Sequence, residues 1–205
     1  KYIQRVPSLY QLAGLNVLKD FAKSVGVTKP SIREFKVQMY MPWEKLFFQC
    51  CHQDINSLDS DNSVTFWIPL HLVSEKSAVS YHKHSHKEGP IKHEEFVDGE
   101  NGIYNACVPE KIKDKYPIIE KAIVDAGDLI ALNRTVFHKS PKFEDQKWSR
   151  WTVVIRYDDI YDNGLYENTT KFEDLTPFSL KRYNEEIIPS IKRILNEKPK
   201  IKWSE

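Results

Sequence analysis

The stretch REFKVQMYM at residues 33–41 marks the point where the chain changes from helical to strand-like spacing. Its apolar side chains fall at every second position, with Lys36, Gln38 and Tyr40 between them. An alternation with period two is typical of a strand that buries one face. We therefore expect a β region to begin at about residue 33.

Further strand-like runs follow, separated by turn-forming segments such as 59–63 and 126–128. The runs cover about residues 45–52, 64–73, 77–82, 118–124, 128–133 and 150–157. Many short strands without alternating helices favour an antiparallel sandwich or barrel over a parallel α/β sheet. The polar segments at about 55–63, 87–117 and 139–149 are interpreted as loops.

Helices are expected on both sides of this β region. Apolar residues spaced by three and four, ending at Gly26, predict one amphipathic helix over about residues 8–25. The same spacing returns after Pro177 and predicts a C-terminal helix over about residues 178–197. The expected fold class is therefore mainly β with flanking helices, and 205 residues suit a single domain spanning 1–205.

The charge balance argues against a nucleic acid or an anionic membrane as partner. Lys and Arg number 30 and Asp and Glu 29, giving a net charge of +1, whereas such partners require clustered basic residues. No apolar run approaches the roughly 18 residues that span a bilayer. Three cysteines, Cys50, Cys51 and Cys107, make no disulfide framework and favour a reducing compartment, so we expect a soluble, cytoplasmic protein. The chain begins at Lys1, which is compatible with a truncated N-terminus.

Candidate metal ligands lie in the segment FFQCCHQD at residues 47–54. Residues two apart on a strand share a face, so His52 and Asp54 can converge. An imidazole and a carboxylate supply two ligands of a facial triad, and the third must come from another strand. His138, which follows the apolar run 128–133, is the natural candidate. Arg150 opens the next run and can bring a cation close to it.

Several segments, in order, resemble the phytanoyl-CoA dioxygenase family of Fe(II)- and 2-oxoglutarate-dependent oxygenases. The resemblance covers about residues 33–157. It is carried by His52-Gln53-Asp54, Thr65-Phe66-Trp67-Ile68-Pro69-Leu70, Ser85-His86-Lys87-Glu88-Gly89, Ala126-Gly127-Asp128-Leu129, His138-Lys139-Ser140 and Arg150. Lys83-His84 departs from the Pro-Gly that commonly precedes the Ser-His-Lys of the family.

The resemblance implies a double-stranded β-helix (jelly-roll, cupin-like) barrel. It also implies that His52, Asp54 and His138 are the catalytic ligands of Fe(II), and that Arg150 and Ser140 bind the cosubstrate 2-oxoglutarate near Trp67. With O2, such an enzyme hydroxylates a C–H bond of a substrate, here a small or medium-sized metabolite, and releases succinate and CO2. The presence of Asp54 favours hydroxylation over halogenation, because related halogenating enzymes lack this carboxylate.

Other interpretations stay open from the sequence. The chain could be a noncatalytic jelly-roll binding module, or a cupin-like hydrolase or isomerase that uses the same triad with Zn2+ or Mn2+. Arg156 shares a strand face with Arg150 and competes with it for the anchoring role. On one extended strand, His82, His84 and His86 would share a face and could bind Zn2+, with an exposed loop as the alternative. Cys50 is expected to point the same way as His52.

Overall fold

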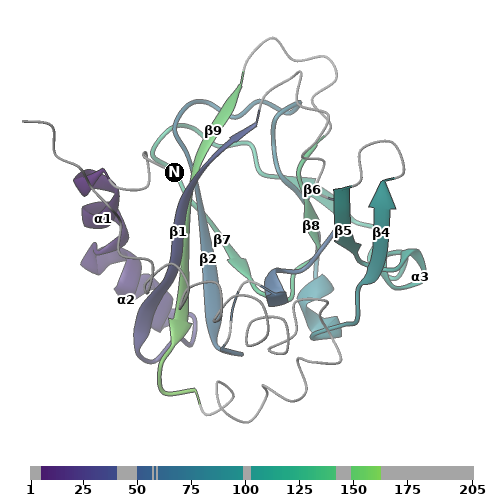
Figure 1. Ribbon diagram of the computed structural model, residues 1–205, viewed down its shortest axis with the longest axis horizontal. Coiled ribbons are helices and arrows are strands. Elements are labelled where there is room, and N and C mark those ends of the chain that lie inside the picture. The colour runs from purple at the N-terminus through teal and green to yellow at the C-terminus, as the bar shows by residue number, and fades with distance from the viewer. Residues whose placement is uncertain are drawn as a thin grey trace, which may run out of the picture.

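Strand β9 (Arg150–Asp159) forms the centre of the main sheet, where it pairs with β1 (Pro30–Tyr40) on one side and β2 (Ser63–Pro69) on the other. Strand β7 (Ile130–Asn133) pairs with β2, which gives the order β1-β9-β2-β7 with every pair antiparallel. The structure, a computed structural model, describes residues 6–40, 50–56, 58, 60–98, 103–141 and 149–162 (Figure 1).

A second, smaller sheet lies opposite the main sheet (Figure 1). Its order is β6-β3-β8, formed by β6 (Ile119–Lys121), β3 (Ser80–His82) and β8 (His138–Lys139), again antiparallel. The hairpin of β4 (Glu94–Asp98) and β5 (Ile103–Cys107) and the short helix α3 (Glu110–Lys113) lie beyond it. The expected mainly β, antiparallel class is confirmed.

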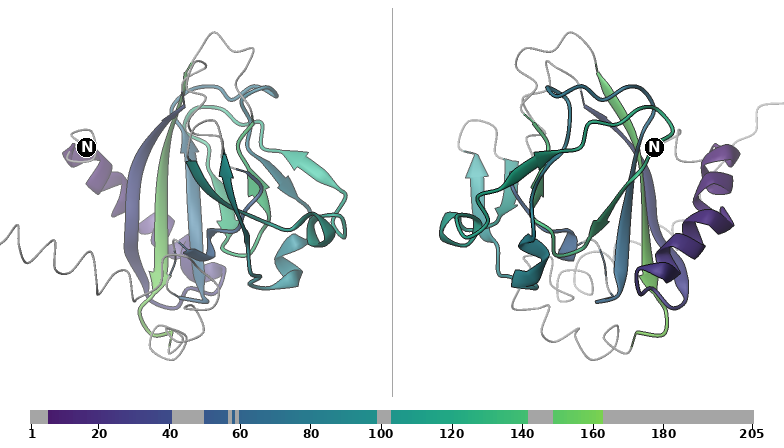
Figure 2. Two further views of the ribbon diagram at one scale, coloured as in Figure 1. Left: turned by 45° about the vertical axis from the view of Figure 1, so that its right-hand side comes forward. Right: turned by 180° about the vertical axis from the view of Figure 1, so that it is seen from behind.

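Two helices cover the outer face of the main sheet (Figure 2). They are α1 (Pro7–Ala13) and α2 (Asn16–Ser24), so the prediction of one continuous helix over 8–25 is wrong. Gly14 ends the first helix, and Leu15 has an extended backbone with φ −59° and ψ 134°. Glycine is a poor helix former, and the break lets both short helices place their buried residues against the sheet.

Strands β2 and β9 contribute to two different cores through strict alternation. Phe66 and Ile155 point outward and pack with the helices, whereas Trp67 and Val154 point inward between the sheets. Because successive side chains of a strand face opposite sides, one strand supplies both the helix-covered core and the interior of the molecule. This alternation positions the candidate site.

Several element boundaries differ from expectation. The run 64–73 ends as a strand at Pro69, which has no N–H to continue a ladder, and the expected loop 87–117 contains β4, β5 and α3. Residues 54–56 and 85–88 form 3-10 helices (Asp54–Asn56 and Ser85–Glu88). Of the run 45–52, residues 45–49 lie outside the described residues, as does the predicted helix 178–197.

Within the ranges that the structure describes, no helix is both long and apolar enough to cross a membrane.

Candidate active site

His52 and His138 lie side by side although they are 86 residues apart in the sequence. Each donates its backbone N–H to the carbonyl of the other, at 2.9 and 3.0 Å, in an isolated antiparallel bridge. Such a bridge places the two side chains on the same face, and the ring centroids are 4.2 Å apart. The sequence-predicted meeting of these two histidines is therefore found in the structure.

Both imidazoles are held in one orientation by the carbonyl two residues earlier. Nδ1 of His52 lies 2.8 Å from the carbonyl oxygen of Cys50, and Nδ1 of His138 lies 3.0 Å from that of Val136. A carbonyl only accepts, so each Nδ1 carries the proton and each Nε2 keeps its lone pair. This is the tautomer in which Nε2 binds a metal ion, with the other nitrogen fixed by an outer hydrogen bond.

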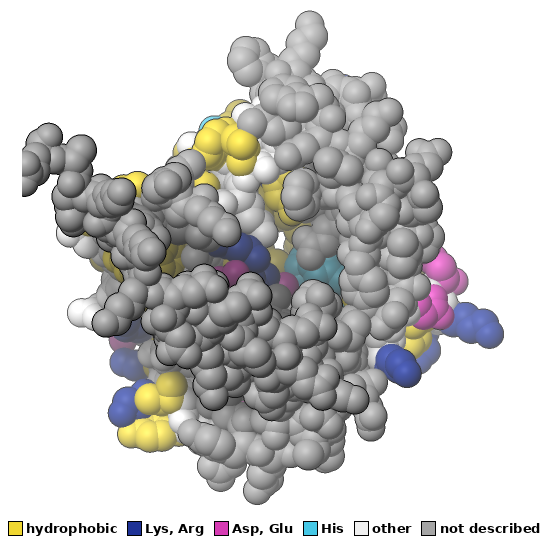
Figure 3. Space-filling model, in the orientation of Figure 1, with side chains coloured by type: hydrophobic (Ala, Val, Ile, Leu, Met, Phe, Trp, Pro, Cys, Tyr) yellow, Lys and Arg dark blue, Asp and Glu magenta, His cyan; other side chains and the backbone are white. Residues whose placement is uncertain are grey.

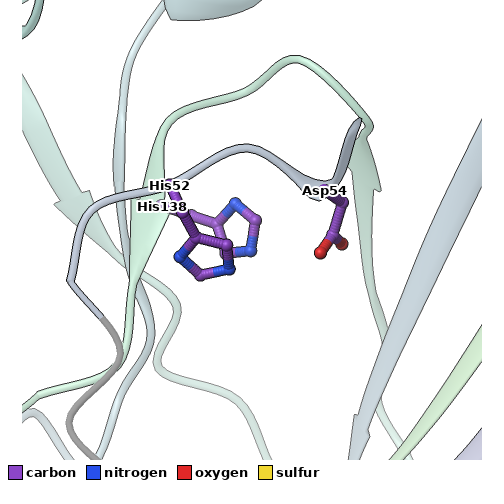
Figure 4. A group of neighbouring side chains, drawn as sticks. All are labelled: His52, Asp54 and His138. Atoms are coloured by element: carbon purple, nitrogen blue, oxygen red, sulfur yellow. The ribbon is translucent and has the colours of Figure 1, made fainter. Parts of the chain in front are cut away.

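Asp54 faces the two rings from the start of a 3-10 helix (Figure 4). Its backbone N–H donates to the carbonyl of Arg134 at 2.9 Å, while the side chain of Gln53 turns away to bond Gly89 and Thr135. The predicted alternation across His52, Gln53 and Asp54 is thus present. One ligand atom from each of His52, Asp54 and His138 lies within 4.8 Å of the others, and all three residues are buried.

The Asp54 carboxylate has a defined partner on each oxygen. Arg156 Nη2 donates to Oδ1 at 2.9 Å, and Thr65 Oγ1 donates to Oδ2 at 2.8 Å. Arg156 also pairs with Glu34 across the β1–β9 pair. The arginine that the sequence offered as a competing cosubstrate anchor is therefore bound by two carboxylates, and it orients Asp54.

The protonation states suit a divalent cation. Burial, and next the neighbouring His138, lower the pKa of His52 to about 3, so its imidazole is neutral at pH 7. Burial alone would raise the pKa of Asp54, but Arg156 and the two histidines outweigh it and hold that pKa well below its usual range. A neutral His52 imidazole and an ionised Asp54 carboxylate can bind a metal without first losing protons.

Arg150 lies in the same interior, 1% exposed. Its Nη1 donates to the carbonyl of Ser77 at 2.6 Å and its Nη2 to Ser140 Oγ at 3.0 Å. The guanidinium carbon is 4.5 Å from the ring centroid of Tyr40 and 5.2 Å from that of Trp67. Burial lowers the pKa of Arg150 to about 10, which leaves it cationic at neutral pH. The structure thus brings Arg150, Ser140 and Trp67 together, as expected from the sequence.

One pocket joins the two groups of residues. Figure 3 shows a hollow in this face, with histidine, acidic and basic side chains visible inside it. The pocket is lined by Gln38, Tyr40, His52, Asp54, Thr65, Trp67, Val79, Leu132, His138, Ser140, Val154 and Arg156. The triad, Ser140 and Trp67 therefore face the same space.

Comparison with known proteins agrees with this arrangement. Residues 34–150 match the model of the phytanoyl-CoA dioxygenase (PhyH) family. The chain belongs to this family. No curated protein sequence matches it.

Solved structures of similar fold include enzymes of this kind. SnoN, a nonheme α-ketoglutarate-dependent epimerase from nogalamycin biosynthesis, is 17% identical, with a TM-score of 0.55 over 75% of this chain and 59% of SnoN. HygX from Streptomyces hygroscopicus, with nickel and 2-oxoglutarate bound, is 15% identical, with a TM-score of 0.54 over 76% of this chain and 69% of HygX. ThoJ, a nonheme monooxygenase, is 17% identical, with a TM-score of 0.51 over 70% of this chain and 51% of ThoJ. The PhyH chain described here therefore spans under two thirds of SnoN and of ThoJ.

The three histidines of the Ser-His-Lys region do not form a second metal site in this PhyH chain. Strand β3 ends at His82, whose Nδ1 donates to the carbonyl of Tyr116 at 2.7 Å. His84 follows in a turn with a left-handed φ of 65°, and His86 lies exposed in the next 3-10 helix. The extended strand that would have aligned them is absent, so the zinc hypothesis is wrong; among the described residues, the group able to hold a metal is the triad.

The cysteines also differ from expectation. Cys50 and Cys107 form a disulfide, with Cα atoms 5.7 Å apart, and Cys51 is a buried free thiol. The structure thus contains one disulfide where the sequence indicated no disulfide framework, so the cysteines no longer argue for a reducing compartment. That Cys50 points the same way as His52 stays a prediction. The 57-residue separation of the pair left no local pattern in the sequence.

Sequence reasoning missed two residues of this site. Thr65 holds the second oxygen of Asp54, and Tyr40 lies against Arg150. A signal existed for Thr65, because it shares a strand face with Trp67, which the family resemblance had already placed near the site. Tyr40 is on β1, whose register against β9 could not be read from the sequence; the structure pairs Tyr40 directly with Arg150.

Proposed function

We propose that this PhyH-family chain is a nonheme Fe(II)- and 2-oxoglutarate-dependent dioxygenase that hydroxylates a C–H bond of a small or medium-sized metabolite. The observation that carries the proposal is the buried triad of His52, Asp54 and His138, which shares one pocket with Ser140 and Trp67. Both of these residues contact the buried, cationic Arg150 behind them. HygX has been solved with 2-oxoglutarate, and SnoN is described as α-ketoglutarate-dependent, which supports the same cosubstrate here.

The triad would hold the metal through two Nε2 atoms and one carboxylate oxygen. Fe(II) held there would supply the oxidative decarboxylation of 2-oxoglutarate by O2 to succinate and CO2. The chain's own part is to keep both imidazoles oriented, to keep His52 neutral, and to keep Asp54 ionised between Arg156 and Thr65.

Arg150 would bind the distal carboxylate of 2-oxoglutarate. A guanidinium offers two parallel N–H donors to a carboxylate and keeps its charge when water is excluded. Ser140 would add a hydroxyl donor from beside it, while the rings of Tyr40 and Trp67 support the guanidinium. Arg156 is already paired with Asp54 and Glu34, so Arg150 is the better anchor.

The overall topology we assign is the double-stranded β-helix, or jelly-roll. It is supported by two opposed antiparallel sheets with the pocket between them, and by neighbours with TM-scores of 0.51 to 0.55. The same proposal includes a single domain over residues 1–205 and a cytoplasmic location. It also includes a small molecule as substrate, with neither a nucleic acid nor a membrane as partner.

The alternatives are less well supported. A noncatalytic module would not require a charge-compensated triad, and a Zn2+ or Mn2+ hydrolase or isomerase would not require Arg150 as a carboxylate anchor. SnoN, an epimerase of similar fold, offers a second outcome for the same machinery. Hydroxylation and epimerisation differ in whether an atom of O2 enters the product, which labelling with 18O2 distinguishes once a substrate is known.

The proposal is tested by adding Fe(II) and 2-oxoglutarate to the protein without oxygen and recording the visible spectrum. We expect a weak charge-transfer band that is lost in His52→Ala, Asp54→Ala and His138→Ala, and slow succinate formation when air is admitted. His84→Ala, which changes an exposed histidine that does not line the pocket, is the matched control and is expected to keep the band. A wild-type protein that binds iron without giving either the band or succinate would contradict the proposal.

A further inference from the structure

The disulfide between Cys50 and Cys107 directly precedes, along the chain, the segment that carries the candidate ligands His52 and Asp54. Cys50 is two residues before His52, and Cys107 is the last residue of β5. Both cysteines are half-buried, so neither residue is sealed off from solvent. The disulfide therefore joins the segment that carries two candidate ligands to the β4–β5 hairpin.

One of the two histidine ligands is oriented directly by a disulfide-bonded residue. His52 Nδ1 donates to the carbonyl of Cys50 at 2.8 Å, and the direction of that carbonyl depends on how the Cys50 residue is held. The matching bond of His138 goes to Val136, next to the fully buried Phe137. Both imidazoles are thus held by a hydrogen bond to a carbonyl, but only the residue that supplies the carbonyl to His52 is itself held by a covalent cross-link.

The segment has a second attachment that does not depend on the disulfide. Val108 donates its N–H to the carbonyl of Cys51 at 2.7 Å, and both residues pack with Phe137 in one apolar cluster. His52 and His138 also keep their reciprocal backbone bonds. Breaking the sulfur–sulfur bond would therefore leave the strands in place and release mainly Cys50 and its carbonyl.

We propose that the Cys50–Cys107 disulfide is a positioning element for His52, and that its reduction by a dithiol weakens metal binding at the triad. This inference rests on the proposed function, since it concerns the same metal site. Reduction transfers two electrons and two protons from the dithiol, which closes to a cyclic disulfide, while the protein bond breaks into two thiols. A dissolved disulfide reverses the step.

The test compares Mn2+ binding by the oxidised, reduced and reoxidised protein. The metal-free protein is reduced with dithiothreitol, freed of the reagent by gel filtration without oxygen, and titrated with Mn2+ while free Mn2+ is followed by electron paramagnetic resonance. Loss of an outer contact to a metal-binding histidine typically weakens affinity 10- to 100-fold, so we expect Kd to rise about tenfold on reduction. Reoxidation with oxidised glutathione is expected to restore it.

Variants separate positioning from general loss of structure. Cys107→Ser is expected to bind Mn2+ as weakly as the reduced wild type and to ignore dithiothreitol. Cys51→Ala keeps the disulfide and is expected to retain the redox response. The absorption bands of bound Co2+, which report ligand geometry, are expected to shift between the two redox states. If Cys107→Ser does not fold, the reduced and reoxidised forms of the wild type decide the matter.

The possible failures are distinguishable. Equal Mn2+ affinity and equal Co2+ bands in the oxidised and reduced protein would overturn the positioning role and leave the proposed function intact. Absence of Mn2+ binding in the oxidised wild type, or binding that survives His52→Ala, would instead count against the proposed metal site itself.

Discussion

Nη2 of Arg156 lies 2.9 Å from Oδ1 of Asp54, and the two residues are 5% and 3% exposed. Asp54 is therefore a compensated buried anion before any cation arrives. A divalent ion entering the pocket meets a carboxylate already held in place, so it need not order that side chain. The same pairing explains why removing either partner is expected to cost more than the pair itself contributes.

Arg156→Gln is expected to lower the free energy of unfolding by about 3 kcal/mol, because it leaves Asp54 buried without its main cation. Added Mn2+ should restore part of that loss by supplying positive charge at the triad. Urea denaturation with and without Mn2+ measures both effects. Arg33→Gln is the control, since Arg33 is half exposed and 3.9 Å from Asp158, and it should change stability by less than about 1 kcal/mol. Equal effects of the two substitutions would refute the prediction.

Thr65→Val removes the hydroxyl that donates to Asp54 Oδ2 and keeps the shape of the side chain. We expect a loss of about 1–2 kcal/mol in stability and weaker Mn2+ binding, because a buried charged acceptor loses a donor. Thr152→Val is the matched control: its buried Oγ1 has no hydrogen-bond partner in the part of the chain that the structure describes. Thr152→Val should leave the free energy of unfolding unchanged or raise it. A loss of stability as large as that of Thr65→Val would contradict the role assigned to the Thr65–Asp54 hydrogen bond.

Arg150→Lys keeps a positive charge but cannot form the two-pronged contact with a carboxylate. The Kd for 2-oxoglutarate, measured by titrating the anaerobic Fe(II) charge-transfer band, is expected to rise at least tenfold. Ser140→Ala should raise this Kd less than Arg150→Lys does. The substitution removes the hydroxyl that accepts a hydrogen bond from Arg150, but it leaves the guanidinium itself in place. Iron binding without 2-oxoglutarate should change little in either variant. An unchanged Kd in Arg150→Lys would mean that a residue other than Arg150 binds the distal carboxylate of 2-oxoglutarate.

Stability is expected to fall as the pH drops from about 6.5 to about 4. Burial lowers the pKa of His93 to about 4, so the unfolded chain takes up a proton in this range that the folded chain does not. The contribution is complete above the unfolded pKa and is lost as the pH falls towards the folded pKa. His93→Gln preserves an acceptor for the backbone N–H of Gln53, now 3.1 Å from His93 Nε2, and should reduce the pH-dependent loss by about 2 kcal/mol. Urea denaturation at pH 7 and pH 4 measures the difference; identical pH dependence in both proteins would contradict it.

The site was predictable from the sequence where alternation decides the outcome. His52 and Asp54 share a face because they are two residues apart, and Arg150 and Arg156 point inward because both lie at even spacing on β9. The choice between the two arginines was not readable from spacing. It depends on the register of β9 against β1 and β2, which puts Glu34 and Thr65 opposite Arg156 and Tyr40 opposite Arg150.

The remaining differences arise from contacts between distant segments. The break at Gly14 follows from how α1 and α2 fit the sheet, and helical spacing alone continues through it. The Cys50–Cys107 bond depends on the end of β5 lying beside Cys51, for which no local pattern exists. The polar composition of the segment 87–117 suggested a loop, whereas two five-residue strands within it, β4 and β5, pair with each other.

Strand β9 places Ile155 against the helices and, on either side of it, Val154 and Arg156 in the pocket. Inserting or deleting one residue within this strand would turn every following side chain to the opposite face. Apolar groups would then fill the pocket, and a guanidinium would be forced under α1 and α2. Homologous chains can therefore be expected to diversify this strand by substitution while its length stays constant, and length variation should be confined to the connections at its ends.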